Sequence, residues 1–500
     1  MENRTKLSKT LKPHWVVAIA FGSAIGWGAF VLPADWMREA GPMGVILGVL
    51  IGALLVMVIA VSYGFLVEKF PVSGGEFVFT YLGFGRINAY ICGWFVTLSY
   101  VTSVALNASA IIVLFKFLYP DLVEIGYMYT IAGWDIYFSQ IIVAGLALIA
   151  FTYSNVRGIK ITGRMQFYFS AALFFGALFL GIAMTLHPET AFSNLQPGFN
   201  MEIGTLSSIL VIVATAPFLY SGFNNIAQAS EEFDFSAKIA FKLMIFGLAS
   251  GGAVYAIMVY TTAMGAPWQQ LTSGQPVWGT GDVVVDMFGS VGLFILTTAL
   301  CMGIFTGING FLVSSSRMLL AMGRARILPS MFTKIHPKFK TPYIGIVTAG
   351  VICFITPWFG RQALLWIVDM TATGVAVAYA YTCASAYKFF KWQESPARKV
   401  FSLAGTLVSL IFLGLLFIPD SPAFLATPSL IALVIWILLG ALFYLFNGRK
   451  YNSIAKKIWI ITFLVKKHLR IMLNGIVCKI KKQKKSRHYN QEGDFYGKVY

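Results

Sequence analysis

Apolar segments long enough to cross a lipid bilayer follow one another along most of this chain of 500 residues. A helix needs roughly 20 apolar residues to cross about 30 Å of hydrocarbon. Twelve ranges are expected to do so: 15–32, 43–67, 89–118, 138–153, 165–186, 203–229, 239–264, 290–316, 344–358, 364–387, 402–418 and 428–446. Only 12% of the residues are charged, against about 25% in soluble domains. The sequence therefore predicts an all-α membrane protein with about 12 transmembrane helices.

Lysine and arginine are unevenly distributed among the connecting segments. They gather in the N-terminal segment, after the even-numbered spans and most densely at 317–340, whereas the segments after odd-numbered spans hold few. Because positive residues stay on the cytoplasmic side, both termini are expected inside a multi-pass plasma-membrane protein, N-in/C-in. The net charge of +18 follows from this pattern and from a basic tail, so no nucleic-acid partner is expected.

The reactive residue types form no pattern that is typical of an enzyme. The five cysteines lie in the expected spans or the inner tail, and the five histidines form no zinc-type cluster, so no disulfide, metal site or cofactor is expected. No nucleophile–base pair stands out, and no phosphate-binding loop of an ATP-driven pump exists. The chain is therefore expected not to be an enzyme.

Two expected spans contain residues that interrupt a helix. The first span has three glycines within residues 22–28, each weakening a helix by roughly 1 kcal/mol relative to alanine. The sixth has Pro217, which removes a backbone donor, followed by Gly222. Close helix packing would explain either one alone. Interruptions at corresponding places in two halves instead indicate an inverted-repeat transporter, whose freed amides and carbonyls suit a zwitterion.

Five motifs, in order, carry a resemblance to the amino acid–polyamine–organocation (APC) permease superfamily, over residues 15–446. They are Gly-x-x-x-Gly-x-Gly-x-Phe at 22–30, Pro-Val-Ser-Gly-Gly-Glu-Phe at 71–77, Asn-Val-Arg-Gly-Ile-Lys at 155–160, Tyr-Ser-Gly-Phe at 220–223, and Ser-Ser-Arg through Met-Gly-Arg to Leu-Pro at 315–329. The resemblance implies a leucine-transporter-like fold with a 5+5 inverted repeat that works by alternating access. Repeat one would occupy 15–186, repeat two 203–387 and two additional C-terminal helices 402–446.

The resemblance also implies which residues hold a substrate. In such permeases the substrate carboxylate lies on backbone amides that match Gly26, Trp27 and Gly28, with Ser23 nearby. The substrate amine lies on carbonyls that match Ile25, Phe218 and Ser221, and Gly222 belongs to the same interruption. The Phe218 ring would cover the bound substrate as a lid.

Two positions depart from the family pattern. Many relatives carry an acid two residues after the glycine of the sixth helix, where this chain has Asn224. Many proton-coupled relatives carry a lysine in the fifth helix, where this chain has Leu173. Exchange, or coupling through another group, therefore stays open.

Three acids remain as candidates for gating or coupling. Glu231 and Glu232 follow the sixth span, and either a solvated loop or a cytoplasmic gate paired with Arg317 or Arg324 would explain them. Asp369 lies inside the tenth expected span, where an acid is costly and marks a functional group. If transport is driven by protons, Asp369 is the carboxylate expected to carry the coupling proton; exchange without a proton is the equal alternative.

Asp369 and Glu76 also have structural explanations. A simple ion pair with Arg361 would explain Asp369 without any part in transport. Glu76, after a Ser-Gly-Gly turn, is expected at the membrane edge with a structural role.

Cytoplasmic tails are expected at both ends, over 1–14 and 447–500. The second alternates apolar and basic residues, which suits a helix on an anionic inner leaflet, although a protein partner would explain it as well.

The leading functional hypothesis is secondary active transport of a neutral or aromatic amino acid. A polyamine or amine permease or exchanger of the same superfamily is the first alternative, and a non-transporting amino acid sensor is the second. The partners expected are a small-molecule amino acid or amine and membrane lipid. The oligomeric state stays undetermined.

Overall fold

The computed structural model describes residues 7–131, 134–273, 277–390, 395–419, 421 and 423–452. The expected C-terminal basic helix lies outside the described residues, as does the first part of the N-terminal tail. Within the described residues, seventeen α-helices account for most of the chain, and one two-stranded antiparallel hairpin is the only sheet.

The helices of the first half run from the N-terminal segment to the end of the eighth helix. Their bounds, with those of the hairpin, are α1 Pro13–Ile25, α2 Gly28–Val31, α3 Pro33–Lys69, α4 Gly75–Phe84, α5 Arg86–Leu118, α6 Pro120–Val123, β1 Tyr127–Ile131, β2 Trp134–Tyr137, α7 Phe138–Arg157 and α8 Ile159–Leu186.

The second half follows after a short 3₁₀ turn, η1 Phe192–Leu195. Its helices are α9 Thr205–Leu219, α10 Asn225–Ala229, α11 Ala240–Gly265, α12 Trp268–Ser273, α13 Gly279–Arg324, α14 Tyr343–Cys353, α15 Gly360–Phe389, α16 Pro396–Phe417 and α17 Thr427–Asn452. Further 3₁₀ turns are η2 Ser230–Glu232, η3 Ala237–Ile239, η4 Ser330–Thr333 and η5 Thr356–Phe359.

Every expected span coincides with helix. Nine described helices are long and apolar enough to cross a membrane, and three shorter apolar helices lie where the first, sixth and ninth spans are expected. The first and sixth spans are short because each is broken in two, as α1–α2 and α9–α10. The predicted all-α membrane architecture is confirmed.

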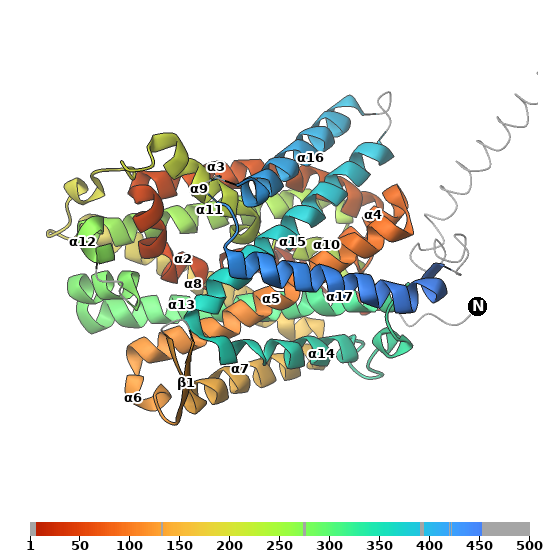
Figure 1. The fold of residues 1–500 in the computed structure, drawn as a ribbon, viewed down its shortest axis with the longest axis horizontal. Coiled ribbons are helices and arrows are strands. Elements are labelled where there is room, and N and C mark those ends of the chain that lie inside the picture. The colour runs from red at the N-terminus through yellow and green to blue at the C-terminus, as the bar shows by residue number, and fades with distance from the viewer. Residues whose placement is uncertain are drawn as a thin grey trace, which may run out of the picture.

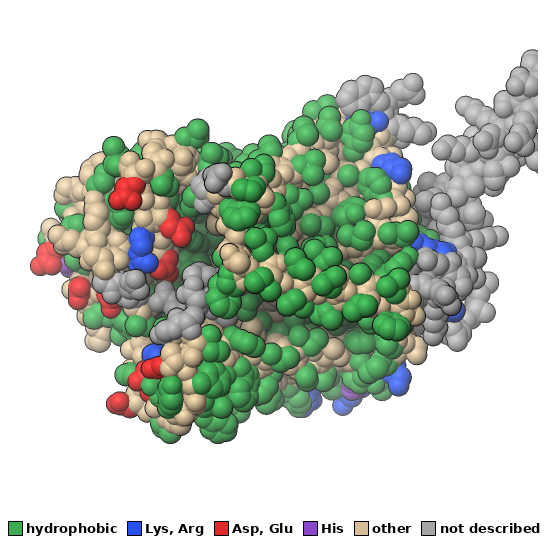
Figure 2. Space-filling model, viewed as in Figure 1, with side chains coloured by type: hydrophobic (Ala, Val, Ile, Leu, Met, Phe, Trp, Pro, Cys, Tyr) green, Lys and Arg blue, Asp and Glu red, His purple; other side chains and the backbone are tan. Residues whose placement is uncertain are grey.

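The long helices lie side by side along the longest axis of the molecule, and the connections gather at its two ends (Figure 1). The hairpin and α12 lie at one end, and the N-terminal segment lies at the other (Figure 1). Lysine and arginine gather toward the N-terminal end, acidic side chains gather at the opposite end, and a broad apolar band separates them (Figure 2). This distribution is the one that the positive-inside pattern predicts.

The two broken helices lie in the interior of this bundle. α1 packs against α8, α11 and α13, and α3 packs against α9 and α11. Residues 15–34 are buried, apart from Val17, which is partly exposed, so the chain remains enclosed by protein where the helix is interrupted. Enclosure is necessary because lipid cannot satisfy the freed backbone groups.

Candidate functional site

A small cavity lies between the two helix breaks. Its lining comes from α1, α2, α5, α9–α10, α11 and α13: Ser23, Ala24, Ile25, Gly26, Trp27, Gly28, Ser103, Leu106, Asn107, Phe218, Ser221, Tyr255 and Phe311. Seven of the eight predicted binding residues are therefore brought together around one space. The eighth, Gly222, lies directly behind it against α1.

The break in the first helix is a turn of two residues. Gly26 has φ 50° and ψ −137°, a combination open mainly to glycine, and its amide still donates to the Gly22 carbonyl at 3.0 Å. The first hydrogen bonds of α2 run from the Phe30 and Val31 amides to the Trp27 carbonyl, at 3.1 and 3.2 Å. The amides of Trp27 and Gly28 thus lie at the junction between the two helices, whereas the Gly26 amide is already used by α1.

The break in the sixth helix is longer and contains Gly222 with φ 138°. A Cβ atom built at Gly222 would come within 2.5 Å of the Ala24 amide nitrogen and 2.7 Å of the Ser23 carbonyl carbon. Only glycine permits this approach, so the two breaks touch through their backbones. The Phe218 carbonyl accepts from the Ser221 hydroxyl at 2.7 Å and from its amide at 3.0 Å.

Tyr255 on α11 joins the two breaks. Its hydroxyl lies 2.9 Å from the Ala24 carbonyl oxygen, 3.2 Å from that of Ile25 and 3.3 Å from that of Leu219. One hydroxyl carries a single proton, so these three freed carbonyls share one donor. At least one of them therefore retains acceptor capacity for a substrate ammonium.

Three side-chain oxygen atoms around the cavity are buried without a hydrogen-bond partner in the described structure. They are the hydroxyls of Ser23 and Ser103 and the Oδ1 atom of Asn107. Leaving such a group unpaired costs about 1–3 kcal/mol. Three in one small space indicate a site that is built to receive a polar ligand.

Glycines on α13 allow the helix to approach this site closely. Gly303, Gly307 and Gly310 follow the i, i+4, i+7 spacing of one helix face. A Cβ at Gly303 would lie 2.1 Å from the Gly26 carbonyl oxygen, one at Gly307 2.1 Å from Asn107 Oδ1, and one at Gly310 1.8 Å from Ser23 Oγ. The glycine face of α13 thus forms one wall of the site, and a side chain at any of these three positions would force α13 away from it.

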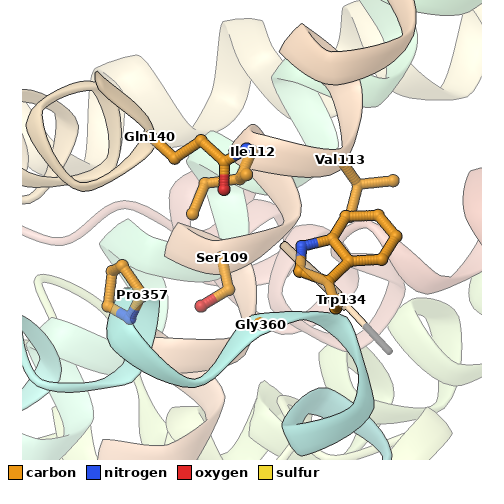
Figure 3. A pocket seen from close by; sticks show the side chains of 7 residues that line it. All are labelled: Ser109, Ile112, Val113, Trp134, Gln140, Pro357 and Gly360. Atoms are coloured by element: carbon orange, nitrogen blue, oxygen red, sulfur yellow. The ribbon is translucent and has the colours of Figure 1, made fainter. Parts of the chain in front are cut away.

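The cavity is about 20 Å³, close to the volume that one water molecule requires. It is therefore in a closed form, and binding of an amino acid requires its walls to separate. A second cavity of about 10 Å³ lies elsewhere, between α5, β2, α7 and α15, and is lined by residues that include Ser109, Trp134 and Gln140 (Figure 3). It touches neither break and contains none of the predicted site residues.

Asn224 does not line the cavity but links the sixth-helix break to a buried acid. Its Oδ1 atom accepts from the Gly222 amide at 3.0 Å. Its Nδ2 atom donates to Glu76 Oε1 at 2.9 Å and to the Tyr100 hydroxyl at 2.8 Å. Asn224 therefore contacts a carboxylate from another element.

Two ion pairs lie at the end where the N-terminal segment packs. Arg317 and Glu232, 1% and 0% exposed, form two parallel bonds of 2.8 Å (Nε to Oε1) and 3.1 Å (Nη2 to Oε2). Arg324 Nη1 lies 2.9 Å from Glu231 Oε2. The Glu232 carbonyl also accepts from the Thr10 and Leu11 amides at 3.1 and 3.0 Å, which fixes the N-terminal segment against the pair. Both acids are thus paired, while their action as a gate stays a prediction.

Asp369 lies apart from these groups. It is half-buried on α15, where it accepts a hydrogen bond of 2.6 Å from the Ser429 hydroxyl of α17. It does not line the cavity. The alternative pairing with Arg361 lies outside the described side chains, and a coupling role for Asp369 stays a prediction.

Several residues of the site carry no clear signal in the sequence. Tyr255, Ser103 and Asn107 are single polar positions in otherwise apolar helices, and their spacing does not show which face meets the breaks. The glycine spacing on α13 was visible and would have indicated a close helix contact. The loop position of Glu76 does not show that its side chain is completely buried, as it is in the structure.

Comparison with known proteins places the whole membrane region in one family. Residues 14–443 match the model of the amino acid permease family. The chain is 25% identical to the methylthioribose transporter of Bacillus subtilis (strain 168), over 90% of this chain and 95% of that protein. It is also 25% identical to the branched-chain amino acid permease of the same strain, over the same shares of the two chains. The aromatic amino acid transport protein of Escherichia coli O6:H1 is 22% identical, over 90% of this chain and 98% of its own length.

Proposed function

The chain belongs to the amino acid permease family, and from that premise we propose that it moves amino acids with neutral side chains, aromatic ones included, by alternating access. The family and its full-length relatives make it a multi-pass membrane transporter for amino acids, which in bacteria lies in the plasma membrane. The side-chain class and the transport mechanism are the proposal.

The observation that carries the proposal is the composition of the cavity lining. No acidic or basic side chain is present among the lining residues. Trp27, Phe218, Tyr255 and Phe311 supply aromatic rings, and Leu106 supplies an aliphatic surface. A cationic or anionic side chain would be desolvated there without a counter-charge, at a cost of several kcal/mol. A neutral side chain meets no such penalty.

The two charged ends of a zwitterion have partners at the breaks. The carboxylate is assigned to the Trp27 and Gly28 amides, with the free Ser23 hydroxyl beside them. Gly26 contributes through its backbone shape, because its own amide is already bonded. The ammonium is assigned to the carbonyls of Ile25 and Phe218. Binding at Phe218 requires the Ser221 hydroxyl to turn away from that carbonyl.

The closed cavity and the buried ion pairs support alternating access. A substrate larger than one water enters only when the bundle opens on one side. Glu232 and Arg317 close the end near the N-terminal segment, and Phe218 covers the cavity from the sixth helix. Opening that end requires the pair to separate, and the pair must be re-formed before the opposite end opens.

An amine or polyamine as substrate has weaker support. Such a cation needs a carboxylate at the site, and Asp369 lies outside the cavity lining. The relatives are named for transport of methylthioribose, branched-chain amino acids or aromatic amino acids, so relatedness alone does not choose among these substrates.

Counterflow in proteoliposomes tests the proposal. Vesicles loaded with unlabelled leucine, phenylalanine, arginine, putrescine or methylthioribose are diluted into the labelled form of the same compound. Leucine and phenylalanine are expected to exchange, and arginine and putrescine are not. Exchange of arginine or putrescine at the rate of leucine would contradict the neutral-substrate proposal. Saturable binding of leucine without exchange would support the sensor alternative.

A further inference from the structure

Glu76 is a buried carboxylate that the proposed transport cycle has not yet used. It lies in the first turn of α4, between two membrane spans, and is 0% exposed. Four neutral side chains from three other parts of the bundle surround it as donors. The Tyr63 hydroxyl of α3 lies 3.3 Å and the Tyr100 hydroxyl of α5 3.0 Å from its Oε1 atom. Asn224 Nδ2 lies 2.9 Å from the same atom, and Gln228 of α10 donates to Oε2.

No cation pairs with Glu76 within the described part of the chain, in contrast to the nearby Glu231 and Glu232. The other titratable groups that face it are all neutral acids: Tyr63 on α3, Cys92 and Tyr100 on α5, and Tyr379 on α15. Burial raises the pKa of the Glu76 carboxyl, and the hydrogen bonds from Asn224, Tyr100 and Gln228 act against that rise.

The surroundings of Glu76 accommodate both of its protonation states. The ionised carboxylate accepts all four bonds. After protonation the carboxyl must donate once, and the Tyr63 or Tyr100 hydroxyl accepts that bond by reversing its own, because a hydroxyl is both donor and acceptor. Protonation also weakens the bond from Asn224, since hydrogen bonds to an ionised group are roughly twice as strong as those to a neutral one.

Asn224 connects this change to the substrate cavity. The Asn224 side-chain Nδ2 atom donates to Glu76 and Tyr100. Its Oδ1 atom accepts from the Gly222 backbone amide at 3.0 Å. Gly222 rests on the backbone of Ser23 and Ala24, and its neighbour Ser221 lines the cavity. A change at Glu76 therefore reaches both breaks through one side chain and one residue of backbone.

We propose that Glu76 binds the proton that drives transport, and that Asn224 transmits its protonation to the two helix breaks. The proposal rests on the transport function above. One proton forms an O–H bond on the Glu76 carboxylate on one side of the membrane and leaves as a hydrated proton on the other. No electron is transferred, and one net positive charge moves with each neutral zwitterion. Glu76 thus supplies the carboxylate that the sixth-helix break lacks at Asn224.

The test uses the full chain in proteoliposomes with labelled leucine and phenylalanine. Counterflow without gradients measures transport alone, and accumulation under an imposed pH gradient measures coupling. The wild-type protein is expected to show both. Glu76→Gln is expected to keep counterflow, lose accumulation to the level of protein-free vesicles, and lose the pH dependence of counterflow. Glu68→Gln, which removes an acid paired with Arg398 at the edge of the same bundle, is the matched control and is expected to accumulate normally.

A second variant and a second measurement test the proposal even if the Glu76→Gln protein misfolds. Adding Asn224→Asp to Glu76→Gln returns the acid to the break and is expected to restore accumulation. In the wild-type protein, dicyclohexylcarbodiimide is expected to modify Glu76 faster as the pH falls, as peptide mass spectrometry would show, because the reagent attacks protonated carboxyls in apolar surroundings.

The outcomes separate the two proposals. Absence of counterflow in the wild-type protein would contradict the transport function itself. Counterflow without pH-driven accumulation would overturn only the proton site, as would accumulation by Glu76→Gln. Loss of accumulation in Asp369→Asn, with Glu76→Gln unaffected, would assign the proton to Asp369 instead.

Discussion

Replacing Gly222 by alanine adds one methyl group where the two helix breaks touch. The new Cβ would lie 2.5 Å from the Ala24 nitrogen, 2.7 Å from the Ser23 carbonyl carbon and 2.9 Å from the Ala24 Cα atom. All three are backbone atoms, so relief requires α1 and the break to separate. Forced repacking of this kind costs typically about 1–3 kcal/mol.

The backbone conformation adds a separate cost, which a control variant isolates. Gly222 has φ 138°, and a residue with a side chain held in such a sparsely populated region costs roughly 1–3 kcal/mol. Gly204, before α9, has φ 82° but no atom within 4 Å of its Cβ position. Gly204→Ala therefore carries backbone strain without the contact. The difference in leucine affinity between the two variants measures the effect of the contact between the breaks.

The assay is substrate binding to purified protein, followed by counterflow. Relative to Gly204→Ala, the Gly222→Ala protein is expected to bind leucine about 5–150-fold more weakly, the factor that corresponds to roughly 1–3 kcal/mol. Both variants are expected to reach the membrane. Equal affinity in the two variants would refute the reasoning, because it would mean that contact between the breaks does not shape the site.

Three further substitutions test the site and its gate. Gly28→Leu is expected to abolish binding while the protein still inserts, since a large side chain beside the free amides blocks a carboxylate; unchanged affinity would remove the first helix from the site. Phe218→Ala is expected to lose uptake but keep surface expression, because a lid matters for occlusion more than for folding; loss of expression would instead show a core residue, whose removal costs about 3–5 kcal/mol. Glu232→Gln leaves Arg317 buried without its counter-charge and is expected to destabilise the closed end by about 3–5 kcal/mol, measured as faster labelling of cysteines placed in the cavity; an unchanged labelling rate would exclude the gate.

The sequence was sufficient to predict the helices and the breaks because both depend on local chemistry. Apolar length defines a span, and the glycines at 22–28 and the pair Pro217 and Gly222 indicate the two breaks, although Gly22 and Pro217 themselves lie inside α1 and α9. The backbone at Gly26 and Gly222 indeed has positive φ, as an interrupted helix requires. The starts of the helices are less well predicted, because α3 and α16 begin at Pro33 and Pro396 whereas the spans are expected to begin at residues 43 and 402.

What the sequence could not show is which polar side chains are buried and which groups they face. The Ser-Gly-Gly turn before Glu76 does not show that the first turn of α4 is buried and that the carboxylate accepts a hydrogen bond from Asn224. Asp369 lies well inside a predicted span, yet it is directed to Ser429 rather than to the cavity. Tyr255 occupies an apolar helix whose pattern does not reveal which face meets the breaks. These placements depend on the packing of distant helices, which periodicity within one helix does not encode.

A structure of the protein with a transported amino acid bound tests the central claim most directly. The account predicts that leucine or phenylalanine lies between the two breaks, in the cavity lined by Ser23, Phe218 and Tyr255. Its carboxylate is expected within hydrogen-bonding distance of the Trp27 and Gly28 amides, and its side chain against the aromatic lining. An amino acid bound instead in the cavity beside Gln140, or against Asp369, would contradict the account.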